Sequence, residues 1–292
     1  MNEAMTVTLK TLTPLWTGGA DGTSDRLHAT GIIGSLRWWY EAVVRGLGGY
    51  ACDPTTDDRC PSEDEKHCTA CELFGCTGWA RKFRLHIVDE NGQLVEGSPG
   101  PNETFKLRFV ELRPISNEEK WLLAKTVEIA AQHGALGGKT TLKPQKKGKV
   151  GADYGIVEWV KGPVIQKPDI AAYLHSSKWR LVETRLPDLR WFFFIRGGFL
   201  WRNQMNPLLG LNENGHPLQK IDDWQRFLQG RRGSTNEPAV SKKIFSFRAD
   251  GGRIWGYAKD KTMRDQIIKQ VRTQLGDGEY QIKTGEEVLH EL

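Results

Sequence analysis

The chain has 292 residues, of which 38% are hydrophobic and eleven are Trp, so wholesale disorder is excluded. This length allows one large domain or two domains of about 150 residues each. The net charge of +5 is modest, residues 1–8 lack the apolar core of a secretory signal, and the longest apolar run (residues 191–195) is too short to span a bilayer. We therefore expect a soluble, cytoplasmic protein.

The first half of the chain predicts alternating strands and helices. A strand over residues 6–12 ends at Pro14 and leads into a glycine-rich loop, after which a helix is predicted over 31–47. Ser116 followed by Glu119 is a capping-box pattern, which marks the start of a second helix. The other elements predicted in this half are strands at 81–89 and 104–112, that second helix at 117–132, and a strand at 154–160.

The second half repeats this order of elements. Gly162-Pro163 and Lys167-Pro168 mark a junction, so the domains are predicted as 1–162 and 163–292. Beyond it the pattern predicts a strand at 190–196, helices at 199–210 and 218–229, strands at 243–249 and 253–258 around an Asp250-Gly-Gly turn, a helix at 262–275 and a strand at 279–284. No residue-level repeat relates the halves.

Both halves follow the order β-α-β-β-α-β. The fold class predicted is therefore α+β, with two fused ferredoxin-like (RRM-like) domains in which helices cover one sheet face. A Cys-rich insertion of about residues 50–78 interrupts the first domain, between the predicted helix at 31–47 and the strand at 81–89.

The five cysteines all lie between residues 52 and 76. The C-x-x-C spacing of one pair lets two thiolates bind one metal ion, and two further cysteines complete a tetrahedral set, with His67 or Cys76 as alternates. The predicted ligands of this structural zinc site are Cys52, Cys60, Cys68 and Cys71. The alternative is a mobile insertion with reduced, unbound thiols, because disulfides are rare in the cytosol.

A second glycine-rich loop begins at Gly134 and leads into a lysine-rich segment. Glycines allow close backbone approach to a phosphate chain, and lysines neutralise it. The two glycine loops together predict an RNA-binding protein, whereas a solvated surface loop is the alternative for the lysines alone. The lysines between residues 134 and 167 are Lys139, Lys143, Lys146, Lys147, Lys149, Lys161 and Lys167.

The sequence contains no Walker loop, H-E-x-x-H or G-x-S-x-G motif. The most suggestive acids are Asp21 and Asp25 in the first glycine loop, where they could hold Mg²⁺ and promote RNA scission. Short acids are also ordinary turn residues. We therefore expect no enzyme, with a metal-dependent endoribonuclease that cuts RNA itself as the alternative.

Four blocks of the sequence resemble the RAMP superfamily of CRISPR-associated proteins. They are TPLWTGG from Thr13, TGIIGSLRWWYEAVVRG from Thr30, CELFGCTG from Cys71 and HGALGGKT from His133. Their order and spacing resemble the first subunit of the type III-B (Cmr) effector complex. Beyond residue 168 only KIFSFRADGGRIWGYA from Lys243 is similar.

This resemblance implies two ferredoxin-like domains and a non-catalytic subunit that binds guide or target RNA in antiviral defence. It implies single-stranded CRISPR RNA or target RNA and the other RAMP subunits as partners, no membrane, and no required cofactor. The second glycine loop continues here with lysines where the family has an arginine-rich run, so the charge is kept but the bidentate forks to phosphate are lost.

The RNA-contacting residues that the resemblance implies come from both glycine loops and from the segments next to them. For Trp39 a place in the core is the stronger interpretation. The full set is Trp16, Gly18, Gly19, Arg26, Arg37, Trp39, Arg81, Lys82, Gly137, Gly138, Lys139, Thr140, Lys143, Lys146 and Lys147.

Overall fold

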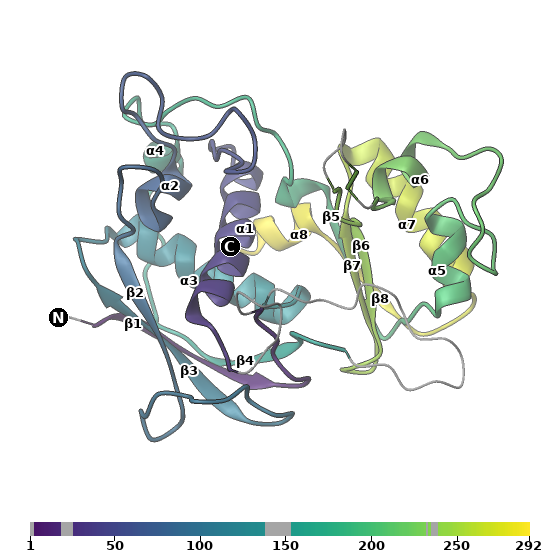
Figure 1. Cartoon of the computed structure of the whole chain (residues 1–292), viewed down its shortest axis with the longest axis horizontal. Coiled ribbons are helices and arrows are strands. Elements are labelled where there is room, and N and C mark those ends of the chain that lie inside the picture. Colours follow the sequence, from purple (N-terminus) through teal and green to yellow (C-terminus); the bar gives the residue numbers. More distant parts are fainter. Residues whose placement is uncertain (1–2, 19–25, 138–152, 232, 235–238) are drawn as a thin grey trace. The chain divides into compact units, whose positions relative to one another are not determined.

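The computed structural model describes residues 3–18, 26–137, 153–231, 233–234 and 239–292. These residues divide into two compact units (Figure 1). The first unit consists of the described residues up to 137 together with 154–189, and the second of 190–291 with Asp153. Residues 163–189 thus pack with the first unit, while the predicted domain boundary at 162 stays a prediction. No described helix is long and apolar enough to cross a membrane.

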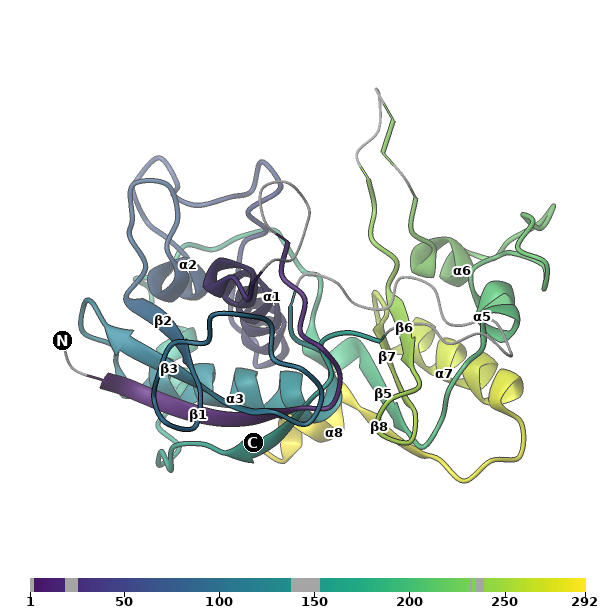
Figure 2. The same cartoon turned by 60° about the horizontal axis from the view of Figure 1, so that its bottom comes forward.

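The first unit is a four-stranded antiparallel sheet with helices on one face (Figure 2). The strand order is β2-β3-β1-β4. Its elements in chain order are β1 (Glu3–Thr11), α1 (Ala29–Gly46), α2 (Thr69–Phe74), β2 (Phe83–Val88), β3 (Thr104–Glu111), α3 (Asn117–His133), β4 (Val157–Lys161) and α4 (Ile170–Leu174).

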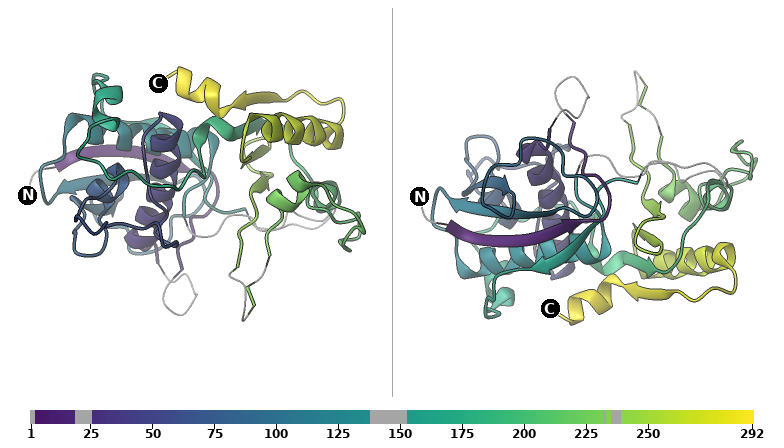
Figure 3. Two further views of the ribbon diagram at one scale, coloured as in Figure 1. Left: turned by 90° about the horizontal axis from the view of Figure 1, so that it is seen from above. Right: turned by 90° about the horizontal axis from the view of Figure 1, so that it is seen from below.

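Alternation along the strands decides which sheet face forms the core. In β3 the side chains at 105, 107 and 109 are buried and those at 104, 106 and 108 are half-buried, because successive strand side chains point to opposite faces. The buried face lies on the side of the helices, of which α1 has apolar residues that recur at helical spacing from Ile32 to Val43. Figure 3 (right) looks onto the other face, which none of the described helices covers.

The predicted capping box at the start of α3 is confirmed. The Ser116 hydroxyl accepts the Glu119 N–H (3.3 Å), and the Glu119 carboxylate accepts the Ser116 N–H (2.8 Å). Most of α3 is buried, from Trp121 to Ala131. This all-round burial explains why the apolar residues of α3 form no single stripe in the sequence.

The second unit has the same topology as the first. Its sheet order is β6-β7-β5-β8, again fully antiparallel, and α5, α6 and α7 pack on one face (Figure 1). The predicted turn at Asp250 joins β6 to β7, with positive φ at 250, 251 and 252. The elements are β5 (Phe192–Arg196), α5 (Arg202–Leu208), α6 (Asp223–Leu228), β6 (Ile244–Phe247), β7 (Arg253–Tyr257), α7 (Lys261–Leu275), β8 (Gln281–Thr284) and α8 (Gly285–His290).

The predicted α+β class with two sheets and a Cys-rich insertion agrees with the structure. Three short helices were not predicted: α2 inside the insertion, α4 after β4, and α8 at the end of the second unit. Each has five or six residues, which is too short to show a periodic apolar pattern.

Two glycines of the first unit offer a matched test of the packing. A Cβ on Gly134 would lie 2.1 Å from the Trp39 ring, whereas a Cβ on Gly34 in α1 meets nothing within 4 Å. We expect Gly134→Ala to lower the free energy of unfolding by about 1–3 kcal/mol through overpacking. Gly34→Ala should raise it by about 0.5–1 kcal/mol, because Ala favours the helix. Urea unfolding measures both, and equal effects would contradict the Trp39 packing.

Candidate nucleic-acid interface

The first glycine loop closes on the side chain of Thr17. The Thr17 hydroxyl accepts the His28 N–H (2.7 Å) and donates to the Arg26 carbonyl (3.3 Å), and Thr17 is fully buried. A Cβ on Gly31, in the first turn of α1, would lie 2.8 Å from the Thr17 side chain. The two ends of this loop are therefore held together at the start of α1.

The second glycine loop begins against the first. The Leu136 N–H donates to the Gly155 carbonyl (2.8 Å), and the Gly155 N–H donates to the Pro14 carbonyl (3.0 Å). Gly137 has φ +102°, and a Cβ there would lie 2.7 Å from the Trp16 carbonyl oxygen. Only glycine fits this close backbone approach. The two predicted loops thus emerge side by side.

Two side chains of helix α1 form hydrogen bonds with the start of the second loop. The Ser35 hydroxyl accepts the Gly137 N–H (3.2 Å), and the Trp39 indole N–H donates to the Ala135 carbonyl (3.0 Å). Sequence reasoning missed Ser35 and Thr17. Both are small polar residues next to a glycine, which is a weak signal for this role.

Four predicted RNA-contacting residues meet at the junction. Arg26 and Gly18 are exposed, Trp16 is half-buried with its ring against Gly18, and Gly137 is half-buried. The predicted residues that lie outside the described part of the chain are Gly19, Asp21, Asp25, Gly138, Lys139, Thr140, Lys143, Lys146 and Lys147.

The structure puts Trp39 in the core. Its side chain is 2% exposed and packs on Gly134. Surrounding residues therefore cover the Trp39 ring, so that it is not accessible for stacking on an RNA base. This agrees with the interpretation of Trp39 as a core residue.

Lys82 pairs with two carboxylates, of which one is buried. Its ammonium lies 2.6 Å from Glu72 and 2.8 Å from Glu119, and Glu119 is 1% exposed. Burial alone would lower the pKa of Lys82, but hydrogen bonds and charge from the two carboxylates outweigh it and raise the pKa. This lysine serves the fold of the first unit rather than a free phosphate-binding surface.

The two predicted arginines outside the loops also contact the protein. Arg81 is half-buried and donates from Nε to the Phe83 carbonyl (3.0 Å). Arg37 donates to the Glu41 carboxylate (2.8 Å), the Gly75 carbonyl (2.7 Å) and the Cys71 sulfur (3.1 Å). Arg37 therefore faces the cysteine segment.

The four predicted zinc ligands come together. The sulfurs of Cys52, Cys60, Cys68 and Cys71 all lie within 4.8 Å of one another, and all four residues are buried. Hydrogen bonds among the four thiols lower the pKa values of Cys60 and Cys68 and raise those of Cys52 and Cys71. The alternates lie apart, since His67 pairs with Glu72 (3.1 Å) and Cys76 is half-buried outside the cluster.

A second basic surface lies on the helix-free face of the first sheet. Arg84 is exposed on β2, and Lys106 and Arg108 are half-buried on β3, where Arg108 lies opposite His86. The strand period of two in the sequence marks these residues, and sequence reasoning missed them.

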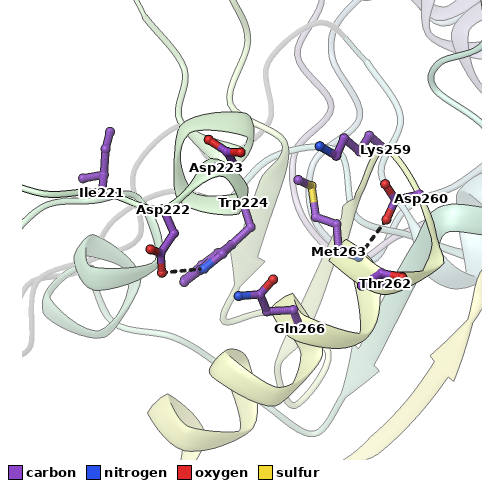
Figure 4. A pocket seen from close by; sticks show the side chains of 9 residues that line it. All are labelled: Ile221, Asp222, Asp223, Trp224, Lys259, Asp260, Thr262, Met263 and Gln266. Carbon is purple, nitrogen blue, oxygen red and sulfur yellow. Dashed lines mark hydrogen bonds between the residues drawn. The ribbon is translucent and has the colours of Figure 1, made fainter.

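A hollow in the second unit is acidic and does not suit a phosphate chain. Its volume is about 560 Å³. Figure 4 shows Asp222, Asp223 and Asp260 on its wall, with Lys259 as the basic lining residue. Asp222 accepts the Trp224 indole N–H (3.1 Å), and Asp260 accepts the Met263 N–H (2.8 Å). These acids cap α6 and α7.

Residues 8–142 match the family model of the RAMP superfamily. This part of the chain is similar to the RAMP superfamily. It contains the first glycine loop, the cysteine cluster and the start of the second glycine loop, so the resemblance that the sequence motifs predicted is confirmed. No curated protein matches the chain in sequence.

Two solved structures are similar to nearly the whole chain. One is a chain of the type III-B Cmr-beta complex bound to cognate target RNA and AMPPnP in the presence of ssDNA. It is 11% identical, with a TM-score of 0.51, over 94% of this chain and 100% of that chain. The other is Cmr1 from Pyrococcus furiosus in its apo form, 11% identical with a TM-score of 0.49, over 97% and 99%. The first likeness shows a shared fold.

Alanine variants of two lysines test whether Lys82 stabilises the fold or binds RNA. We expect Lys82→Ala to lower the free energy of unfolding by roughly 2–4 kcal/mol, because it leaves Glu119 buried and unpaired. Lys125→Ala removes a half-exposed pair with Glu128 (2.9 Å), which should cost less than about 1 kcal/mol. Urea unfolding measures both. Unchanged stability of Lys82→Ala, with weaker RNA binding, would return Lys82 to the interface.

Proposed function

We propose that this chain is a non-catalytic, RNA-binding RAMP subunit of a type III-B CRISPR (Cmr) effector complex. Its two sheets of identical order would be two ferredoxin-like domains. Its partners would be single-stranded CRISPR or target RNA and other RAMP subunits, in antiviral defence. The observation that carries the proposal is the junction at which the described ends of both glycine loops meet, with the Gly137 backbone against Trp16.

The chemistry of this junction suits a phosphate backbone. Arg26 is exposed, the glycines lack side chains that would hold the backbone away, and the sequence beyond Gly137 supplies Lys139, Lys143, Lys146 and Lys147. Phosphate contacts carry no base code. The proposed binding is therefore salt-dependent and nearly independent of RNA sequence.

The similar solved structures support the choice of partner. The Cmr-beta structure that shares this fold is bound to cognate target RNA. The residues that match the RAMP model contain the first glycine loop and the start of the second. Together these findings favour RNA over other polyanions as the ligand.

Titration of labelled single-stranded RNA at about 50 and 200 mM salt tests the proposal. We expect Arg26→Ala to weaken binding and to flatten the slope of log affinity against log salt by up to ~0.7, the value for one lost phosphate contact. Replacing the four loop lysines by Ala should flatten it further. The matched control is Arg59→Ala, because Arg59 is equally exposed but lies among acids of the cysteine segment.

Three outcomes of this titration would contradict the proposal. An unchanged salt slope in the Arg26 and lysine variants would remove the loop junction as the binding site. No RNA binding by the unaltered chain would favour a subunit that contacts only neighbouring proteins. Shortened RNA in the presence of Mg²⁺, lost in Asp21→Ala or Asp25→Ala, would establish the endoribonuclease alternative.

A further inference from the structure

The cysteine cluster has the dimensions of a site for one metal ion. In a tetrahedral zinc site with Zn–S bonds of about 2.3 Å, the sulfurs lie about 3.8 Å apart. The Cys52 and Cys71 sulfurs are 3.5 Å apart, and no pair in the cluster exceeds 4.8 Å. A disulfide requires about 2.05 Å, and iron–sulfur clusters place several metal ions between their ligands. A single tetrahedral ion fits best.

Two backbone N–H groups donate hydrogen bonds to sulfurs of the cluster. The Cys52 N–H donates to the Cys68 sulfur (3.4 Å), and the Cys68 N–H donates to the Cys60 sulfur (3.3 Å). Donors directed at sulfur stabilise a thiolate, which is the form that binds metal.

Two arginines from distant parts of the chain contact two different sulfurs. Arg37 on α1 donates to Cys71 (3.1 Å), and Arg180, which follows α4, donates to Cys60 (3.7 Å). Four thiolates around one divalent cation leave two negative charges. Buried charge is stable only when it is paired, and the two guanidinium groups supply that pairing.

Side chains next to the cluster form hydrogen bonds and an ion pair with the segments that flank it. The Asp58 carboxylate pairs with Arg180 (3.1 Å) and accepts the N–H groups of Glu183 (2.7 Å) and Thr184 (2.9 Å). Arg45, 4% exposed, donates to the carbonyls of Ala51 and Cys52. These bonds fasten both flanks of an acid-rich segment that has little apolar material of its own.

We propose that Cys52, Cys60, Cys68 and Cys71 bind one structural zinc ion as thiolates, with Arg37 and Arg180 as positioning residues that neutralise and orient the sulfurs. The ion fixes the insertion between α1 and β2 and the segment after α4. This site stands apart from the proposed RNA-binding junction, so it can be right or wrong independently of that function.

Metal analysis of the protein purified without chelator tests the site. We expect about one zinc ion per chain, retained in Cys76→Ser and lost in Cys68→Ser. The fifth cysteine is the matched control because it lies outside the cluster. Since Cys68→Ser could fail to fold, the metal content of the unaltered chain decides: less than half an equivalent, or iron in place of zinc, overturns the proposal.

The arginines are tested by zinc release and by spectroscopy. Arg180→Ala and Arg37→Gln should release zinc to a competing chelator at least ~10-fold faster than the unaltered chain, because residues that orient metal ligands contribute this much to affinity. In the cobalt-substituted protein, the thiolate-to-metal absorption band should shift in both variants. Arg59→Ala is the control and should change neither. An unchanged release rate and band in both arginine variants would overturn their role.

Discussion

The packing of Trp39 on Gly134 determines where the second glycine loop starts. The indole of Trp39 occupies the space that any side chain at 134 would need, and its N–H holds the Ala135 carbonyl. This contact joins α1 to the end of α3. Two residues later the chain reaches Gly137, whose backbone lies against Trp16. The junction of the two loops therefore depends on a tryptophan that is itself buried in the core.

Helix α1 serves two different sites from one side of a sheet. Its first turns hold the loop junction, through Gly31 and Ser35. Two arginines later in α1 point toward the cysteine segment. Arg37 donates a hydrogen bond to a cysteine sulfur, and Arg45 donates to the backbone of that segment. The loop junction and the cysteine cluster are thus built on one rigid element, which allows each to be positioned with little loss of conformational freedom.

The order of elements was predictable from the sequence because local patterns determine it. The strand alternation, the capping box at Ser116 and the turn at Asp250 depend on neighbouring residues, and each agrees with the structure. The meeting of Cys52, Cys60, Cys68 and Cys71 was predictable from the C-x-x-C pair and from the two further cysteines close before it, whereas metal binding stays a prediction. The two units have the same strand order, but the two halves of the sequence show no residue-level repeat. Two domains can share a topology without sharing residues.

The roles of individual charged residues were less predictable. Arg37, next to two tryptophans, and Lys82, next to Arg81, have the sequence neighbourhood of RNA-binding residues, yet their partners are Cys71 and Glu119. Arg180 lies 120 residues from the sulfur it contacts, and no local pattern marks such a pairing. Which face of an element a side chain occupies, and what the fold brings opposite it, is set by tertiary packing.

Crosslinking of the intact chain to thiouridine-labelled single-stranded RNA, followed by mass spectrometry of the peptides, tests the central claim most directly. The account predicts crosslinked peptides from residues 13–31 and 133–156, the two loops and their junction. Crosslinks confined to residues 190–291, with none in either loop, would contradict it.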